Sequence, residues 1–313
     1  MVASSFISSS NVMSFFKKAI IVILSVVVID ILVGFACRAI LKSLPENHSP
    51  LSIDKHNFFS EQSDVIVMGA SQAKHQYDPR IFNDSLGLKS YVAAQDGIDI
   101  IQNYIYLKAI FDRKAPKIVI LEVYPGYLEG GKSYRINNLN MWYGLSEPVT
   151  EYFDTRASWQ DRLKLKSNLY TYNSLFYHLV RMAFRSEKTI DGYVPMHGEY
   201  DGEFKYYKKF APDSLQLEYL DKIVDLCKSN GTLLVISRSP IFIVHNTYNK
   251  WLGEYCREKD LKLFNHSADT TLTNHPELFR DGHHLNEKGS TIYSKILAGE
   301  IKRLRNGFPP PKP

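Results

Sequence analysis

Residues 19–37 read AIIVILSVVVIDILVGFAC, an almost wholly apolar run near the start of the chain. A helix of this length rises about 28 Å, which is close to the thickness of the hydrocarbon layer of a membrane. The run has no amphipathic pattern, which a surface helix of a water-soluble domain would show. It therefore predicts a membrane-spanning helix, with a buried helix of a soluble protein as the alternative.

The flanks of this run indicate how it is anchored. Lys17 and Lys18 precede it, and no small-residue cleavage site clearly follows it. We therefore expect an uncleaved signal anchor, with residues 1–18 in the cytoplasm and the rest of the chain on the other side. Arg38 and Lys42 on the far side weigh against this orientation.

Asp30 is the one charged residue within the apolar run. A carboxylate in hydrocarbon is costly, so such residues usually pair with another group. We expect Asp30 either to contact a helix partner in the membrane or to lie off-centre, where it is tolerated.

Beyond a polar segment at 38–62, which is expected to be a linker, short apolar runs alternate with helical patterns. The expected strands are 64–69, 89–94, 116–123, 231–236 and 261–264, and the expected helices are 98–113, 214–229, 247–259 and 286–305. Alternation with this spacing favours parallel α/β units. The expected fold class is therefore α/β, with a mostly parallel central sheet in a three-layer α/β/α domain at residues 63–306.

The alternation is interrupted over residues 126–212. This part is rich in Tyr, Asn and Trp, and the pattern indicates helices at 158–167 and 173–185 and a loop at 192–198. We expect a helical insertion over one edge of the sheet. The tail, 307–313, contains a Pro-Pro-Pro run that cannot continue a helix, and it is expected to be flexible.

Composition argues against two classes of function. The net charge is +5, but the Lys and Arg residues are scattered, so nucleic-acid binding is not indicated. The three cysteines, Cys37, Cys227 and Cys256, include no Cys-x-x-Cys pair, so no zinc or redox spacing is present. Cys227 and Cys256 are expected to be buried free thiols.

Ser71 follows the first expected strand, in the sequence Gly69-Ala70-Ser71. Ligands of open parallel sheets bind at the carboxyl ends of the strands, so this hydroxyl is expected at the rim where substrates bind. A serine there is a candidate nucleophile once a base removes its proton. The alternative is that Ser71 only caps the helix that follows.

A matching base is present late in the chain, in Asp281-Gly282-His283-His284. One short turn can deliver both an imidazole and the carboxylate that orients it, which is the arrangement of a serine triad. Asp281 could instead be a simple turn residue. A metal site made of His275, Asp281, His283 and His284 is a further alternative, although these residues lack a recognised ligand spacing.

Both motifs together resemble the SGNH (GDSL-like) hydrolase superfamily, whose domains are flavodoxin-like. Gly69-Ala70-Ser71 is similar to its first block, Gly-Asp-Ser, and Asp281-Gly282-His283-His284 is similar to its last block, Asp-x-x-His. The resemblance implies the triad Ser71, His284 and Asp281, with the N–H groups of Ser71 and Gly97 in the oxyanion hole. The Asn that completes this hole in the family is missing, because the third expected strand ends in Glu122-Val-Tyr-Pro-Gly126.

The stretch around Ser71 looks most like a membrane-anchored bacterial subgroup that includes the D-alanine transfer protein and polysaccharide O-acyltransferases or esterases. This resemblance implies a single-pass protein of the bacterial cytoplasmic membrane whose catalytic domain is extracytoplasmic. The implied reaction releases or transfers an acyl group, with acetyl as one candidate, on a cell-surface polysaccharide or other acylated glycan. It needs no metal or organic cofactor, and a membrane-bound O-acyltransferase is an implied partner.

Three residues are candidates for substrate binding: His283, beside the proposed base; Arg238, after the strand 231–236; and Tyr124, after the strand 116–123. A solvated arginine and aromatic packing of the insertion are the alternatives for Arg238 and Tyr124. His75 is expected to be a solvated or helix-packing histidine. The rival to the enzyme hypothesis is a catalytically silent scaffold that binds glycan or a membrane partner, which the missing Asn favours.

Overall fold

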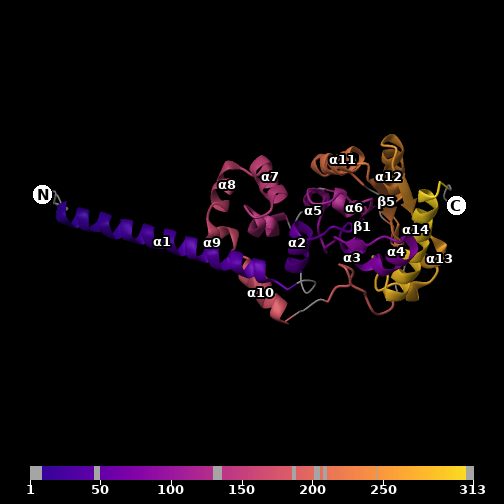
Figure 1. Cartoon of the computed structure of the whole chain (residues 1–313), viewed down its shortest axis with the longest axis horizontal. Helices are drawn as coiled ribbons and strands as arrows, with labels where there is room; N and C mark the ends of the chain where they lie inside the picture. Colours follow the sequence, from indigo (N-terminus) through magenta and orange to yellow (C-terminus); the bar gives the residue numbers. More distant parts are fainter. Residues whose placement is uncertain are drawn as a thin grey trace.

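The computed structural model describes residues 9–45, 50–129, 136–184, 188–200, 205–206, 210–244 and 246–307. Within them a five-stranded parallel sheet has the order β2-β1-β3-β5-β7 (Figure 1). The strands are β1 (Val65–Met68), β2 (Ser90–Val92), β3 (Ile118–Glu122), β5 (Leu233–Arg238) and β7 (Lys262–Asn265). In chain order this is the 2-1-3-4-5 arrangement of flavodoxin-like sheets. The expected α/β class with a mostly parallel central sheet is confirmed.

The central strands β1 and β3 are buried on both faces, as their continuous apolar sequences require. They pair in register from Val65 with Ile118 to Met68 with Leu121. Because parallel strands end at the same edge, the residues that follow Met68 and Glu122 emerge side by side. This edge is where the candidate site lies.

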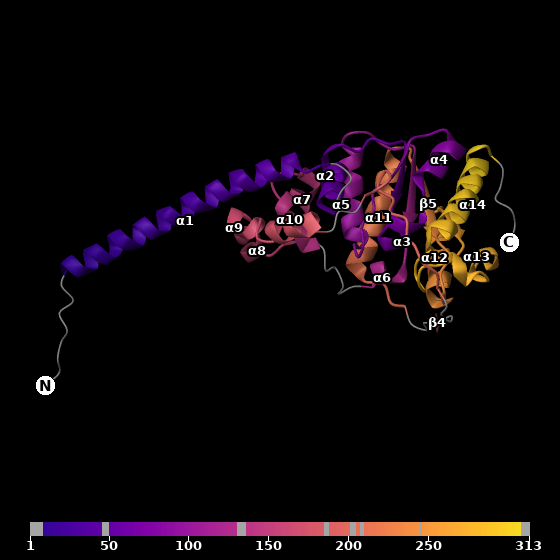
Figure 2. The same ribbon diagram turned by 90° about the horizontal axis from the view of Figure 1, so that it is seen from below.

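Helices cover both faces of the sheet, so the domain has three layers (Figure 2). One face is packed by α3 (Ser71–Gln76), α4 (Pro79–Leu86) and α14 (Glu287–Arg305). The other face is packed by α5 (Ile100–Phe111), α11 (Ser214–Ser229) and α12 (Asn246–Glu258). Alternate residues of β1 lie in the hydrophobic cores on opposite faces of the sheet. Val65 and Val67 face α14, whereas Ile66 and Met68 face α5.

The segment 38–62, expected to be a linker, contains helix α2 (Pro50–Phe59), which packs against α5. Leu51, Ile53 and Phe58 are buried, and so is the polar side chain of Asp54. The Asp54 carboxylate accepts hydrogen bonds from Gln95 and Tyr106. The polar composition that indicated a linker therefore reflects a buried hydrogen-bond network, and this helix belongs to the folded body.

Helix α1 (Ser9–Ser43) contains the apolar run as one continuous helix that projects away from the body (Figure 1). Its part from Val12 to Ser43 is long and apolar enough to cross a membrane, and almost none of it is buried. These properties are compatible with a single-pass anchor. Residues 1–8 of the expected cytoplasmic end lie outside the described residues.

The insertion expected at 126–212 is mostly helical up to residue 184, as expected, and contains a short strand later. Its elements are α6 (Pro125–Leu128), the 3-10 helix η1 (Ile136–Trp142), α7 (Glu147–Arg156), α8 (Trp159–Leu165), α9 (Asn168–Thr171), α10 (Leu175–Phe184) and β4 (Lys205–Tyr206). Strand β4 pairs with β6 (Ile243–Val244) in a small separate sheet. Residues 130–135, 185–187, 201–204 and 207–209 of the insertion, and 308–313 of the expected tail, lie outside the described residues.

Candidate active site

Ser71 stands at the first position of α3, directly beyond the end of β1. The turn between them depends on Gly69, whose φ of +146° is a conformation that L side chains rarely adopt. A Cβ atom there would also lie 2.7 Å from the Cβ of Ala73. The N–H of Gly69 donates to Oδ1 of Asn103 at 2.8 Å, which holds the turn in place.

The Ser71 side chain does not cap its helix. The N-cap position is Ala70, and the structure gives α3 no side-chain cap hydrogen bond. The Ser71 hydroxyl instead lies 2.8 Å from Nε2 of His284, a residue 213 positions later in the chain. The helix-capping alternative is therefore not supported, and the strand end and the late loop meet at one point.

The loop that carries His284 is held on both sides. Its ends are joined by a backbone hydrogen bond of 2.8 Å from Arg280 N–H to the carbonyl of His284. The N–H of Phe242 donates to the carbonyl of Gly282 at 3.1 Å. Nε2 of Gln76, in the same helix as Ser71, donates to the carbonyl of His283 at 2.9 Å. The last bond ties the loop to the helix of the candidate nucleophile.

Asp281 lies behind the imidazole. Its Oδ1 is 2.9 Å from Nδ1 of His284 and also accepts the backbone N–H groups of His283 and His284. Burial raises the pKa of Asp281, but the hydrogen bonds from His284 and His283 outweigh burial and lower the pKa to about 2. The carboxylate is therefore an acceptor, Nδ1 carries a proton, and Nε2 is free to accept the Ser71 proton.

Gly97, the other expected oxyanion donor, lies in an exposed turn with a φ of +70°. Its neighbour Asp96 accepts hydrogen bonds of 2.9 Å from Nζ of Lys74 and from Nε2 of His75, both in α3. Burial raises the pKa of Asp96, and these two partners lower it below its ordinary value. The turn of Gly97 is thereby tied to the helix that begins at Ser71.

His75 is a packing histidine. Besides Asp96, its ring contacts the carbonyl oxygen of Val194 through Nδ1 at 2.7 Å, and the side chain is almost fully buried. Its ring centroid is 5.9 Å from that of His284 in an edge-to-face arrangement. His75 therefore buttresses the imidazole and does not reach the surface.

The candidate substrate contacts Tyr124 and His283 are partly buried and close to each other, with ring centroids 5.8 Å apart. The ring of His283 is 6.1 Å from that of His284. His283 thus lies beside the candidate base and Tyr124 lies next to His283, and the role of both in substrate binding remains a prediction.

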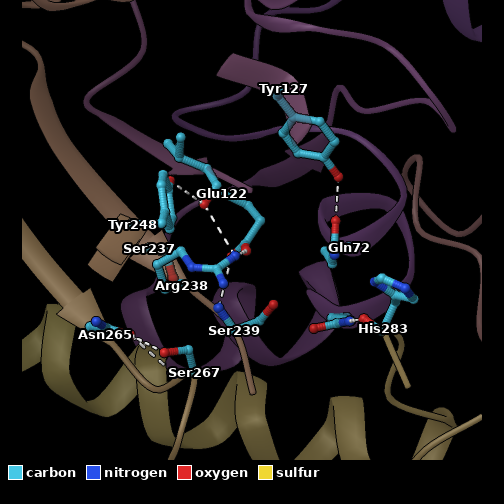
Figure 3. A network of polar contacts seen from close by, with 12 residues as sticks. Gln72, Glu122, Tyr127, Ser237, Arg238, Ser239, Tyr248, Asn265, Ser267 and His283 are labelled. Atoms are coloured by element: carbon cyan, nitrogen blue, oxygen red, sulfur yellow. Dashed lines mark hydrogen bonds and ion pairs between the residues drawn. The ribbon is translucent and has the colours of Figure 1, made fainter. Parts of the chain in front are cut away.

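Arg238 is the candidate that the structure does not place at the rim. Its side chain is 1% exposed, and Nη1 lies 3.5 Å from Oε1 of Glu122 and 3.2 Å from the carbonyl of Val123 (Figure 3). Its guanidinium lies between the rings of Tyr124 and Tyr248, 5.6 and 5.2 Å from their centroids. The arginine is buried because a buried acid on the neighbouring strand pairs with it.

Glu122 depends on this pairing. It is fully buried, and burial raises its pKa above the ordinary value, although Arg238, Tyr77 and the N–H of Ser239 offset part of that rise. Removing the guanidinium by Arg238→Met should therefore lower the free energy of unfolding by about 3–5 kcal/mol, because a buried charge is left without its partner. Thermal or urea unfolding measures this loss. The double variant Arg238→Met/Glu122→Gln should recover part of it.

A surface pair is the matched control. Lys222 and Glu218 are both exposed and 2.9 Å apart, and Lys222→Met should cost at most about 1 kcal/mol. Equal losses in the two single variants would contradict the structural role assigned to Arg238.

Tyr127 was not among the candidates, yet it lies at the site. It follows β3 in α6, and its hydroxyl donates to Oε1 of Gln72, the residue next to Ser71 (Figure 3). Burial raises its pKa well above the ordinary value, while the nearby Ser71 hydroxyl lowers it. Tyr127 therefore remains a protonated donor beside Ser71. The signal in the sequence was the end of the third expected strand, which lacks the Asn of the family but is followed by Tyr127.

The metal alternative finds no support among the described residues. They contain no group of three or more His, Cys, Asp or Glu side chains arranged to hold a metal ion. His275 is exposed and pairs with Glu277 at 2.9 Å.

No protein-family model matches this chain, and no curated protein matches it. Among solved structures it is similar to a protein from Bacteroides fragilis described as an acylhydrolase, with 11% identity, a TM-score of 0.38, and coverage of 81% of this chain and 93% of that chain.

Two further structures show comparable likeness. One, from Desulfitobacterium hafniense, is described as a lipolytic protein of the G-D-S-L family, with 11% identity, a TM-score of 0.38, and coverage of 77% and 99%. The other is an acetyl xylan esterase from the rumen bacterium Butyrivibrio proteoclasticus, with 10% identity, a TM-score of 0.34, and coverage of 80% and 64%. Likenesses this low carry no weight for the fold or the chemistry, which rest on the strand order and the distances above.

Proposed function

We propose that this chain is a membrane-anchored serine esterase or O-acyltransferase that works through an acyl-serine intermediate. One observation carries the proposal: the Ser71 hydroxyl, the imidazole of His284 and the carboxylate of Asp281 form a hydrogen-bonded chain with distances of 2.8 and 2.9 Å. A nucleophile in contact with a base, and a base oriented by an acid, is the geometry that activates serine for acyl transfer.

The proposed reaction has two halves. Nε2 of His284 takes the Ser71 proton while Oγ attacks the carbonyl carbon of an ester, and Asp281 stabilises the imidazolium. The tetrahedral intermediate collapses as His284 gives the proton to the leaving alcohol, and Ser71 is left acylated. Water or a sugar hydroxyl, deprotonated by His284, then attacks the acyl-serine. The second tetrahedral intermediate collapses as His284 returns this proton to Oγ, which releases the acid or the new ester and restores Ser71.

Three donors are proposed to hold the oxyanion. The N–H of Ser71 lies in the first turn of α3, where backbone N–H groups have no partner within the helix. The resemblance adds the N–H of Gly97. We assign the third place to the hydroxyl of Tyr127, because it is held next to Ser71 through Gln72 and burial keeps it protonated. It would replace the missing Asn by turning its proton from Gln72 toward the oxyanion.

Tyr127→Phe removes this donor and little else. We expect kcat to fall about 10²–10³-fold with KM nearly unchanged, because the hydroxyl acts on charge that develops only in the transition state. Steady-state hydrolysis of p-nitrophenyl acetate measures both constants. Tyr143→Phe, which removes a hydroxyl bonded to Asp154 in the insertion, is the control and should behave as the native protein. A Tyr127→Phe variant with unchanged kcat would remove Tyr127 from the oxyanion hole.

The cellular setting is part of the proposal. The apolar helix α1 supports a single-pass anchor in a membrane. The resemblance to the membrane-anchored bacterial subgroup supports the cytoplasmic membrane, an extracytoplasmic domain, and an acylated cell-surface polysaccharide as substrate. A membrane-bound O-acyltransferase would be the donor-side partner if acyl groups are transferred and not hydrolysed.

The proposal is tested with full-length protein in detergent, given an O-acetylated polysaccharide together with an unacetylated oligosaccharide acceptor. Acetate release indicates hydrolysis, and an added acetyl mass on the oligosaccharide indicates transfer. Either product, absent with the Ser71→Ala variant, supports the proposal. If native protein produces neither and also hydrolyses p-nitrophenyl acetate no faster than the variant, the chain is a silent scaffold.

A further inference from the structure

Helix α10 of the insertion has apolar side chains on two faces. Leu175 is buried, and Leu179 and Met182 pack against the core. On another face, Phe176, Val180 and Phe184 are spaced four residues apart and are 77%, 39% and 85% exposed. The same helix also carries His178 and Arg181, yet no element among the described residues covers the outer stripe of large apolar side chains.

The neighbouring helices α8 and α9 also expose apolar side chains. Trp159 and Leu163, one turn apart in α8, are 66% and 60% exposed, and Leu169 of α9 is 42% exposed. Arg162 and Lys164 flank them, which is the mixture of Trp, Leu and basic residues typical of helices at a membrane interface. Exposed apolar surfaces of this kind mark an interaction site.

The insertion is fastened to the part of α1 expected to lie in hydrocarbon. The carboxylate of Asp30 accepts hydrogen bonds from the side chains of Ser167 and Asn168 and from the backbone N–H groups of Asn168 and Leu169, at 2.7–3.0 Å. One turn further on, a Cβ on Gly34 would lie 2.3 Å from Oδ1 of Asn168. Helix α9 thus contacts α1 at two successive turns, and Asp30 finds its partner in its own chain.

The position of this contact along α1 determines how deep in the membrane α9 would lie. From Lys18, which marks one end of the apolar run, to Asp30 a helix rises about 18 Å, whereas the hydrocarbon layer is about 30 Å thick. If Lys18 lies at one boundary, α9 meets α1 about 12 Å inside the other. Helices α8 and α10 adjoin α9 in the chain, and Figures 1 and 2 place both at the end of the body from which α1 projects.

We propose that α8, α9 and α10 are embedded in the lipid leaflet on the side of the catalytic domain, with the exposed stripes of α8 and α10 facing acyl chains. The insertion and α1 then form a two-part membrane anchor that fixes the orientation of the body. A lipid environment is favoured over a protein partner because the stripes belong to helices that adjoin α9, and α9 contacts α1 within the thickness of the hydrocarbon layer.

The test uses full-length protein in vesicles of phosphatidylcholine and phosphatidylglycerol, with or without bromine on the acyl chains. Bromine quenches tryptophan on contact. Of the three tryptophans, Trp142 is buried in the body and Trp251 packs in α12, so Trp159 is the one expected to meet lipid. Brominated lipid should lower the fluorescence of native protein and leave that of Trp159→Phe unchanged.

A second pair of variants tests the proposal independently of the fluorescence of Trp159. In the Trp159→Phe background, Phe184→Trp in α10 should restore quenching. Ile292→Trp should not, because this position is 41% exposed but belongs to α14, which Figure 1 shows at the end of the body remote from α1. If neither Trp159 nor Phe184→Trp is quenched more than Ile292→Trp, the insertion faces water or a protein and the proposal is overturned.

Discussion

The Ser71→Ala variant is expected to hydrolyse p-nitrophenyl acetate with a kcat about 10⁴–10⁶-fold below that of the native protein. The alanine removes the only atom that can form the acyl intermediate, while the loop of His284 stays tied to α3 through Gln76. Residual turnover would come from binding and the oxyanion donors alone. Steady-state assays on full-length protein in detergent measure the loss.

Two further variants make this prediction specific. His284→Ala should lose about as much, and the double variant Ser71→Ala/His284→Ala should lose little more than either, because the two residues act as one unit. Ser229→Ala, an exposed serine at the end of α11, should be fully active. Multiplicative losses in the double variant would show that the two side chains act independently, contrary to the 2.8 Å contact between them.

Asp281→Asn is expected to lower kcat about 10⁴-fold with the fold intact. The carboxylate holds the proton on Nδ1 of His284, whereas an amide can donate to Nδ1 and so favour the tautomer in which Nε2 cannot accept the Ser71 proton. The assay is the same, and an unchanged thermal unfolding midpoint shows that the loss is chemical.

The pKa of Asp281 adds a condition on pH. Because that pKa is about 2, below the ordinary value for an aspartate, the carboxylate stays ionised down to about pH 4. Activity that native protein loses between pH 7 and 4 therefore cannot come from protonation of Asp281. Asp161→Asn, a change at an exposed aspartate of the insertion, is the control and should leave the pH profile unchanged. An active Asp281→Asn variant would contradict the orienting role of the carboxylate.

The sheet could be predicted from the sequence because its strands are short apolar runs that end at turn residues. The expected strands at 64–69 and 116–123 became β1 and β3, each shorter by one or two residues at either end. The long helices α11 and α14 were also predicted nearly to their termini, because their polar and apolar faces alternate at the helical period. The order of the strands within the sheet depends on how distant strands pair, and no run of residues in the sequence shows it.

The polar parts of the core were not predictable. The segment that contains helix α2 has the composition of a linker, because polar residues such as Asp54 and Asn57 are usually exposed. In the structure both are buried. Arg238 was expected at the rim because it follows the expected strand 231–236, but β5 extends to Arg238, whose partner Glu122 is 116 positions away in the sequence. Burial of such groups depends on distant partners, which pattern alone does not reveal.

The candidate site was only partly visible in the sequence. Ser71, Asp281 and His284 stood in recognisable motifs, and the structure brings their side chains together. Tyr127 was not predicted as a site residue because a tyrosine among other aromatic residues is usual in any well-packed loop. Its position beside Gln72 depends on the packing of α3 against β3, which brings the two residues together.

The most direct test is to treat full-length protein with a fluorophosphonate, which phosphonylates serines activated by a neighbouring base, and to map the adduct by peptide mass spectrometry. Our account predicts one rapidly formed adduct on Ser71, absent in Ser71→Ala and formed far more slowly in His284→Ala. A native protein that stays unlabelled, or a label that persists in Ser71→Ala, would contradict the assignment of Ser71 as the nucleophile.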